Sequence, residues 1–230
     1  MPKRSKRYTE SKALIDSKKL YTPDEAVELV KKTATTKFES SVEVHVRLGI
    51  DVKQSDQQIR ATITFPHSTG KTKKIAAFVP EAKQKEAKEA GADMVGAEDL
   101  IDEIAKTNKV DFDIAVATPD MMPKLAKIAK VLGPKGIMPN PKTDTVGPNV
   151  KKLVEDLKKG KVAYKNDAQG IVHQAIGKTS LNASALLENF QSLIESLRKH
   201  KPSSAKGLYF KSVTLSSTMG PGIKVDVSGI

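Results

Sequence analysis

Two short glycine–lysine–threonine segments are the first candidates for a chemical role. Gly70-Lys71-Thr72 and Gly177-Lys178-Thr179 both resemble the end of a phosphate-binding loop. Such a loop needs another glycine five residues before the glycine of the Gly-Lys pair, and those positions hold Phe65 and Val172. The loop must also lead into a helix, whereas the residues after Lys73 form an apolar run typical of a strand. Both segments are therefore predicted to be turns and not nucleotide sites.

The titratable side chains form no catalytic or metal-binding pattern. The four histidines, His45, His67, His173 and His200, are isolated, with neither metal-ligand spacing nor a neighbouring nucleophile. The absence of cysteine excludes disulfide bonds, thiolate metal sites and cysteine nucleophiles. No Gly-x-Gly-x-x-Gly follows a predicted strand, so a dinucleotide site is not expected. We expect no enzyme activity, no cofactor and no metal ion.

The charge balance indicates a polyanionic partner. The 230 residues include 39 Lys and Arg against 27 Asp and Glu, a formal net charge of +12. Residues 69–160 account for +3 of this charge and the remainder of the chain for +9. Such a surplus attracts nucleic acid or an anionic membrane. The sequence contains no lipid-attachment motif, membrane-spanning apolar run or secretory signal, so we expect nucleic acid, no membrane and a cytoplasmic location.

The two ends of the chain have the pattern of an α+β structure. Thr22-Pro23-Asp24-Glu25 is typical of a helix start with a capping box. Alternating apolar residues predict half-buried strands, and the first two of these are predicted to form a hairpin. Phe210 and Val213 share a face only if their strand contains a bulge. The predicted strands cover residues 42–50, 59–65, 162–165, 171–176, 209–217 and 223–227, and a helix is predicted over 184–199.

The middle of the chain alternates buried strands with helices, which is typical of a parallel sheet with covering helices. The strands are predicted at 75–79, 94–95 and 114–117, and the helices at 81–91, about 100–105, 121–132 and 150–159. These patterns predict a discontinuous α+β domain, 1–68 and 161–230, into which an α/β domain, 69–160, is inserted. The chain would pass between the two domains twice, each time as a single segment, and these two connections would form a hinge. Its residues are Pro66, His67, Ser68, Gly70 and Gly160.

Two segments rich in glycine and proline are candidate RNA contacts. Residues 133–142 would form either a rigid connector or a stiff loop that offers Lys135 and Lys142 to phosphates. Residues 216–222 would form either a plain turn or a site where Gly220 permits close approach, hydroxyls meet ribose and Met219 packs on RNA. Phe38 is either a stacking residue or a core residue. The N-terminal basic cluster, Lys3, Arg4, Lys6 and Arg7, is expected to neutralise phosphates.

With these segments the chain resembles, in order and over nearly its whole length, the L-one family of ribosomal proteins in its bacterial form. This family belongs to the mobile lateral stalk of the large subunit. The proline-rich stretch and the Thr-Met-Gly-Pro turn are the most specific matches. The matching segments are Ala34–Phe38, Val42–His45, Gly49–Asp51, Phe112–Asp113, Ala117–Asp120, Leu132–Lys142, Thr145–Gly147, Tyr164–Asp167, Gly170, His173, Gly177–Lys178 and Thr218–Pro221.

The resemblance implies a split α+β RNA-binding domain with an inserted Rossmann-like three-layer α/β domain. It implies binding to the stalk helices of large-subunit rRNA, assistance to exit-site tRNA, and repression through the protein's own operon mRNA. A translational regulator that acts only off the ribosome is the alternative, and the protein is expected to be a monomer there. Family contacts map onto Lys37, Phe38, Ser41 (often threonine in relatives), Glu43, Asn166, Asp167, His173, Lys178, Ser212, Thr218, Met219 and Gly220.

Overall fold

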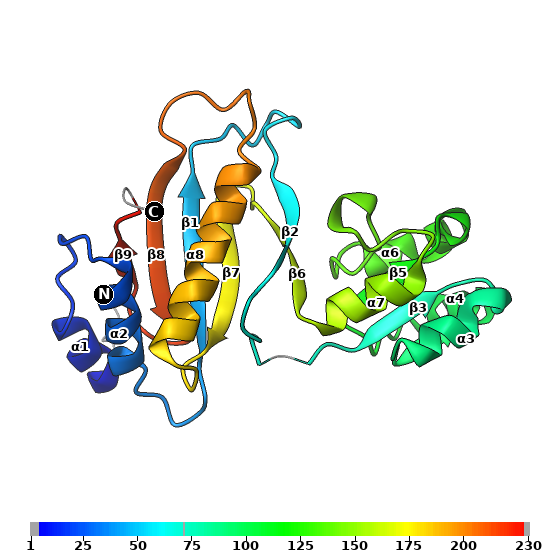
Figure 1. The fold of residues 1–230 in the computed structure, drawn as a ribbon, viewed down its shortest axis with the longest axis horizontal. Helices are drawn as coiled ribbons and strands as arrows, with labels where there is room; N and C mark the ends of the chain where they lie inside the picture. The colour runs from blue at the N-terminus through cyan, green and yellow to red at the C-terminus, as the bar shows by residue number, and fades with distance from the viewer. Residues whose placement is uncertain (1–4, 71, 228–230) are drawn as a thin grey trace. The chain divides into compact units, whose positions relative to one another are not determined.

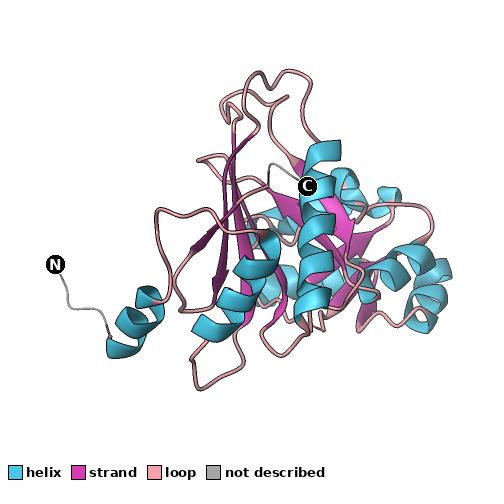
Figure 2. Cartoon of the chain, turned by 60° about the vertical axis from the view of Figure 1, so that its left-hand side comes forward, coloured by secondary structure: helices cyan, strands magenta, loops and turns pink. Residues whose placement is uncertain are grey.

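The structure, a computed structural model, describes residues 5–70 and 72–227 (Figure 1). The chain divides into two compact units. We call Met1–Gly70 with Ala163–Ile230 the split unit, and Lys71–Val162 the inserted unit. Both units contain helices and strands (Figure 2). The predicted combination of α+β and α/β structure is therefore confirmed.

The split unit is built on a four-stranded antiparallel sheet in the order β7-β1-β8-β9. Strand β1 lies inside this sheet and pairs with β7 along one edge and with β8 along the other (Figure 1). A separate two-stranded sheet joins β2 to β6. The strands are β1 (Ser41–Leu48), β2 (Arg60–Thr64), β6 (Lys161–Lys165), β7 (Ile171–Lys178), β8 (Phe210–Ser217) and β9 (Ile223–Val225).

The predicted hairpin of the first two strands is wrong. Both strands exist, but β2 pairs with β6 and not with β1. Alternation along a strand shows which face is buried and does not identify the neighbouring strand. Both edges of β1 are already hydrogen-bonded to β7 and β8, so no edge remains for β2.

The predicted bulge in the strand of Phe210 and Val213 is confirmed. Leu48 pairs with Phe210 and Arg47 with Ser212, so Lys211 has no counterpart in β1. The extra residue lets Phe210 and Val213 satisfy one apolar face in spite of their spacing. Of the two Gly-Lys-Thr segments, Gly177 and Lys178 end β7 and lead into a turn, whereas Lys71 lies outside the described residues.

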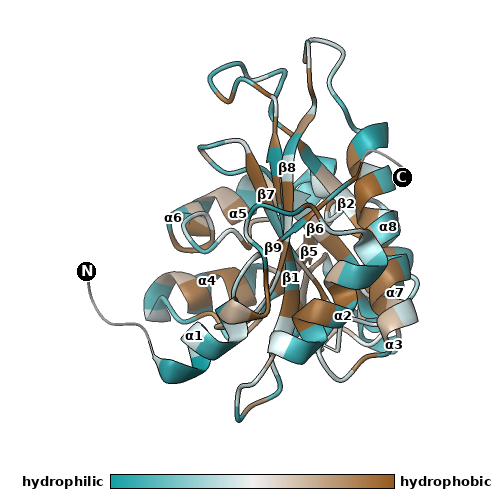
Figure 3. Ribbon diagram, turned by 90° about the vertical axis from the view of Figure 1, so that its left-hand side faces the viewer, coloured by the Kyte–Doolittle hydropathy of each residue, from teal (hydrophilic) through white to brown (hydrophobic). Residues whose placement is uncertain are grey.

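Helices cover one face of the four-stranded sheet. They are α2 (Pro23–Thr33) and α8 (Ala183–Lys199), and a shorter helix, α1 (Lys6–Ala13), precedes α2 in the chain. Helix α2 packs against α8, β8 and β9, and α8 also contacts β7. The predicted capping box is confirmed: Thr22 Oγ1 accepts from the Glu25 amide and Glu25 accepts from the Thr22 amide, both at 3.4 Å. Helices α2 and α8 show both polar and apolar residues in Figure 3, as helices on a core do.

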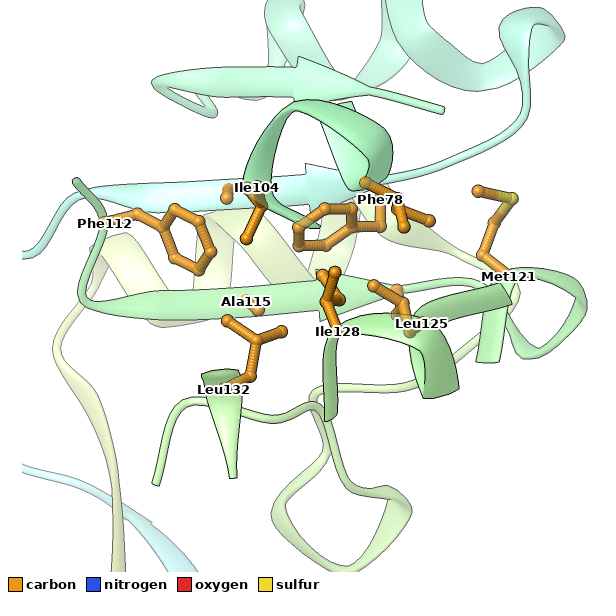
Figure 4. Packing of buried hydrophobic residues seen from close by; sticks show 11 residues of the cluster. Phe78, Ile104, Phe112, Ala115, Met121, Leu125, Ile128 and Leu132 are labelled. Carbon is orange, nitrogen blue, oxygen red and sulfur yellow. The ribbon is translucent and has the colours of Figure 1, made fainter. Parts of the chain in front are cut away.

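The inserted unit is a three-layer arrangement around a parallel sheet in the order β4-β3-β5. Alternate residues of β3 enter two different cores. Ile75 and Ala77 pack with Val154 of α7, while Ala76 and Phe78 pack with residues such as Ile104 of α4 (Figure 4). The elements are β3 (Ile75–Phe78), α3 (Glu81–Glu89), β4 (Met94–Gly96), α4 (Glu98–Thr107), β5 (Ile114–Ala117) and α7 (Val150–Lys158).

The single helix predicted over residues 121–132 is wrong. The segment is divided into η1 (Pro119–Met121), α5 (Met122–Leu125), η2 (Ala126–Ile128) and α6 (Ala129–Leu132). The break follows Ile128, whose ψ of 8° departs from helical geometry. Met121, Leu125, Ile128 and Leu132 remain buried, so the apolar spacing is met without a continuous helix. Gly133 follows the last turn with a right-handed φ of −60°, and its amide donates to the Ala129 carbonyl.

A buried asparagine joins three segments of the split unit. Asn189 of α8 is fully buried. Its Oδ1 accepts from the His67 amide at 3.1 Å, and its Nδ2 donates to the carbonyls of His67 at 3.1 Å and Ile176 at 2.8 Å. Asn189 thereby fixes the chain just before Gly70 and the irregular end of β7 to the same helix.

Asn189→Leu should lower the free energy of unfolding of the split unit by about 3 kcal/mol, because it leaves three polar groups unpaired inside the protein. All four tyrosines lie in this unit and tryptophan is absent, so tyrosine fluorescence during urea unfolding reports on the split unit alone. Ser192→Ala on the same helix is the control, with an expected change below about 0.5 kcal/mol. Equal stability of Asn189→Leu and the control would contradict the assignment.

Candidate nucleic-acid interface

The face of the four-stranded sheet opposite α2 and α8 is polar, and we call it the open face. Alternate residues of three strands form it, and none of them is buried. The strand register sets them in cross-strand rows. The rows are Ser41 with Lys178; Glu43 with Ala175 and Ser216; His45 with His173 and Thr214; and Arg47 with Ile171 and Ser212.

All twelve predicted RNA contacts lie in the split unit, on the open face or at its two ends. At the end where β1 starts and β8 stops lie Lys37, Phe38, Ser41, Lys178, Thr218, Met219 and Gly220. Glu43 and His173 lie at mid-face, and Asn166, Asp167 and Ser212 lie at the other end. Sheet pairing brings these residues together from both sides of the insertion.

The turn at Thr218–Gly220 is fastened to β1. The Thr218 amide donates to the Ser41 carbonyl at 3.0 Å, and the Thr218 hydroxyl accepts from the Ser41 amide at 3.1 Å. The Gly220 amide donates to the Ser217 carbonyl at 2.8 Å. The Thr218 hydroxyl therefore serves the turn itself. The residue that projects is Met219, which has a left-handed φ of 63° and a side chain that is 68% exposed.

A second apolar side chain is exposed at the same end of the sheet. Phe38 is 54% exposed, so the alternative that it is a core residue is wrong. It stands three residues before β1, and the neighbouring Lys37 is also exposed. Exposed aromatic and thioether side chains beside a lysine suit contact with the flat faces of bases and with ribose.

Lys178 is not a free cation. Its Nζ donates to Glu39 Oε2 at 2.7 Å, and the Ser180 hydroxyl donates to the other carboxylate oxygen. The hydrogen bond from Lys178, followed by that from Ser180, lowers the pKa of the Glu39 carboxyl. A phosphate that approaches Lys178 must therefore compete with Glu39.

Asn166 and Asp167 use most of their polar atoms inside the protein. Asn166 Oδ1 accepts from the Ile59 amide at 2.7 Å, which links the segment beside β2 to the turn before β7. Asp167 Oδ1 accepts from the amides of Gln169 and Ile171, both at 2.8 Å. The bond from the Ile171 amide is the largest cause of the lowered pKa of Asp167, and the charge of nearby His173 acts in the same direction. These two residues shape the end of the open face.

A pair of histidines at mid-face was missed by the sequence reading, which took all four histidines as isolated. The Nδ1 atoms of His45 and His173 are 2.8 Å apart, His45 Nε2 lies 3.0 Å from the Ser216 hydroxyl, and His173 Nε2 lies 3.5 Å from Asp167. One Nδ1 must donate and the other accept, so the bond is lost when both rings are protonated. Only the register reveals this pair, because 128 positions separate its members.

Burial lowers the pKa of His45, and the adjacent His173 lowers it further, whereas Glu43 opposes this shift. Besides these groups, the exposed Arg47 and the hydroxyls of Thr214 and Ser216 lie in the rows around His45. A proton on His45 is thus disfavoured in the folded chain. The middle of the open face therefore favours a neutral His45 imidazole.

The candidate residues of the inserted unit lie in an ordered loop. Lys135 and Lys142 are both exposed. Asn140 accepts from the Lys142 amide at 2.8 Å, and its own amide donates to Thr145 Oγ1 at 2.8 Å. Gly136 has a left-handed φ of 70°. The loop is therefore stiff and presents exposed lysines. This fits both alternatives predicted from the sequence, a rigid connector and a loop that offers lysines to phosphates.

The predicted hinge residues differ in their local constraints. Gly70 and Gly160 have left-handed φ values of 72° and 97°, which favour glycine. A side chain at Gly160 would meet no atom within 4 Å. His67 is held by Asn189 and also contacts Glu188 at 2.9 Å, and the Ser68 hydroxyl accepts from the Gly70 amide at 3.3 Å. Pro66 precedes this anchored stretch.

The described part of the chain contains no cluster of acidic and histidine side chains that could hold a metal ion. Across residues 5–70 and 72–227, no three His, Asp or Glu side chains are placed to share a metal ion. The helices in these same ranges all lack the combination of length and apolar character needed to cross a bilayer. The split unit has a polar pocket of about 530 Å³, whose lining residues are Gly49, Ile50, Asp51, Gln54, Gln57, Ser204, Lys206 and Lys211.

The lowered pKa of His45 predicts a pH-dependent stability. The pKa in the unfolded chain is about 6.5, so below that pH the unfolded chain binds more protons than the folded one, and the free energy of unfolding falls. His45→Gln removes this ionisation but keeps a hydrogen-bonding side chain. Between about pH 8 and about pH 5.5, urea unfolding should show a larger loss of stability for the wild type than for the variant. A parallel loss in both proteins would refute the pair's role.

Comparisons with known proteins place the chain in a family. Residues 30–221 match the sequence model of the Ribosomal protein L1p/L10e family. The chain is also 50% identical, over 228 residues, to a protein of Fervidobacterium nodosum named large ribosomal subunit protein uL1, covering 99% of this chain and 97% of that relative. A family match over most of its length and a half-identical relative show that the chain belongs to the Ribosomal protein L1p/L10e family.

Proposed function

We propose that this structural protein of the large ribosomal subunit binds the stalk helices of large-subunit rRNA through the open face and the Thr218–Gly220 turn. The observation that carries the proposal is the turn itself, which is fastened to β1 and presents an exposed Met219 with a left-handed φ. The family is one of structural and RNA-binding proteins, and the chain is not an enzyme.

Recognition in this proposal relies on shape. Helical RNA offers its wide minor groove, with ribose hydroxyls and phosphates, more readily than its base edges. Met219 and Phe38 would pack on exposed ribose or base surfaces, and Gly220 permits close approach of the backbone. The hydroxyls of Ser41 and Ser212 would bond to ribose or phosphate. Glu43 and His173 would face RNA at mid-face, while Asn166 and Asp167 hold that end of the surface in shape.

Attraction to RNA in general comes from the charge of the split unit. The parts of the chain outside residues 69–160 carry +9. Lys37 is exposed and Lys178 becomes available when it leaves Glu39. Neutralised phosphates release counterions, so this component of binding weakens as salt rises.

We also propose that residues 1–68 and 161–230 form the RNA anchor and that residues 69–160 form an arm that moves with the stalk. Lys135 and Lys142, on their stiff loop, would contact exit-site tRNA or neighbouring rRNA. Because His67 is bonded to α8, bending at the first crossing would occur after His67, around Ser68 and Gly70, and at Gly160 in the second crossing. This assists movement and release of the tRNA.

The same surface would bind the protein's own operon mRNA wherever that mRNA copies the shape of the rRNA site, and so repress translation. A regulator that works only off the ribosome is the alternative, and it uses the same contacts. Co-sedimentation with large subunits distinguishes the two, because a protein confined to mRNA would stay in the supernatant. Off the ribosome we propose a cytoplasmic monomer.

Met219→Ala and Thr218→Val should each remove most of the preference for a stalk rRNA fragment over a scrambled duplex, about 1–3 kcal/mol for a lost packing contact. Met219→Ala deletes the projecting side chain, and Thr218→Val removes the hydrogen bonds of the Thr218 hydroxyl to Ser41 while keeping the backbone bond. The slope of affinity against salt should not change, because no cation is lost. Leu208→Ala, at another exposed apolar residue, is the matched control. Wild-type protein that binds both RNAs alike would defeat the proposal.

Glu39→Gln should raise affinity for both RNAs about two- to fivefold at low salt, because it frees Lys178 for phosphate. The gain should vanish in Glu39→Gln combined with Lys178→Gln. Filter binding across a salt series measures the affinity of the single and of the double variant for both RNAs. An unchanged affinity of the single variant would mean that Lys178 does not meet phosphate.

A further inference from the structure

The N-terminal helix reaches the recognition turn through one arginine. Helix α1 begins at Lys6, and the hydroxyl of the preceding Ser5 caps it by accepting from the Tyr8 amide. Arg7 Nη2 donates to the carbonyl oxygen of Met219 at 3.0 Å, across 212 positions of sequence. The sequence reading assigned Arg7 to phosphate neutralisation, together with Lys3 and Arg4, which lie outside the described residues. The structure gives Arg7 a partner within the protein.

Arg7 is also less available to RNA than its neighbours. Lys6 and Lys12 on the same helix are exposed, whereas Arg7 is only partly so. Its second terminal nitrogen, Nη1, is buried and has no hydrogen-bond partner among the described residues. A guanidinium placed in this way is directed at the turn and not at the solvent.

The backbone conformation of Met219 in the turn is unfavourable and requires stabilising contacts. Met219 has a φ of 63°, which is unfavourable for a residue other than glycine and persists only when the surroundings hold it. The bonds between Thr218 and Ser41, and between Gly220 and Ser217, hold the residues on either side of Met219. The bond from Arg7 acts on the peptide group of Met219 itself. Because the donor is charged, it is stronger than a neutral hydrogen bond.

We infer that Arg7 is a positioning residue, which holds the Thr218–Gly220 turn in the conformation that presents Met219 to RNA. The inference rests on the proposed role of that turn. It assigns Arg7 to the preference for one RNA over another, and not to the general attraction between a basic protein and phosphates. An N-terminal helix far from the turn in sequence thereby becomes part of the recognition site.

The two roles of Arg7 have different signatures. A phosphate contact would contribute to the salt slope, about 0.7–0.9 for each phosphate, and would be replaced by lysine. A residue that only holds the turn in its conformation contributes to the preference for one RNA over the other at any salt concentration. Lysine would replace it only in part, because its single ammonium lacks the planar fork of arginine.

The test compares Arg7→Gln, Arg7→Lys and the matched control Lys12→Gln, which removes one exposed charge from the same helix. Each full-length protein is titrated with the stalk rRNA fragment and with the scrambled duplex across a salt series. Arg7→Gln should lose about tenfold in preference with an unchanged salt slope, and Arg7→Lys should recover part of that loss. Lys12→Gln should keep the preference.

A second measurement in the absence of RNA reads the turn directly. The backbone amide resonances of Met219 and Gly220 should shift in Arg7→Gln and stay in place in Lys12→Gln, while tyrosine-monitored unfolding shows that both variants remain folded under the conditions of the titration. Arg7→Gln that lowers the salt slope and keeps the preference would overturn the inference in favour of a phosphate contact. Unmoved amide resonances would overturn it as well.

The two proposals fail in different ways. If wild-type protein shows no preference between the RNAs, the proposed function of the turn falls, and the amide resonances alone then decide whether Arg7 braces it. If Met219→Ala removes the preference but Arg7→Gln does not, the turn recognises RNA without the brace.

Discussion

The pairing of β1 with strands on both of its edges is the constraint on which the rest of the split unit depends. Both partners, β7 and β8, follow the inserted residues in the chain, so β1 has no partner until the chain has returned. Each cross-strand row of the open face depends on this closure. Ser41 meets Thr218 across 177 positions and His45 meets His173 across 128. Because the sheet is closed by long-range contacts, its formation must bear the entropy of joining distant segments.

The same constraint divides the polar groups of the surface into two kinds. The Thr218 hydroxyl, the Asn166 amide and the Asp167 carboxylate complete bonds that close the sheet and its turns. The side chains of Phe38, Met219, Lys37 and Ser212 project from this framework and are exposed. The residues that the resemblance implies as RNA contacts therefore differ in kind. Some build the shape of the surface, and others are the part of it that a partner would touch.

Features that depend on adjacent side chains could be predicted from the sequence, whereas features that depend on contacts between distant segments could not. The capping box at Thr22, the strand alternation of β1 and the bulge near Phe210 each follow from a few adjacent side chains, and all were predicted. The hairpin was wrong because alternation does not name a partner strand. The helix over residues 121–132 was wrong because apolar spacing is compatible with broken turns. The His45–His173 pair and the bond from Arg7 to Met219 could not be predicted, since only the tertiary structure creates them.

The positive charge of the split unit attracts any nucleic acid, so charge alone does not distinguish one RNA from another. The surface contains features that oppose this attraction. Glu39 is paired with Lys178, Glu43 lies beside the histidine pair, and burial, followed by the charge of His173, disfavours a proton on His45. If the open face binds RNA as proposed, an RNA held by charge alone meets acidic groups and a lysine that is already paired with Glu39. An RNA whose shape also allows contact with Met219 and Phe38 would regain the free energy spent in displacing Glu39. The acidic residues of this face would then favour selectivity by weakening the general attraction to RNA.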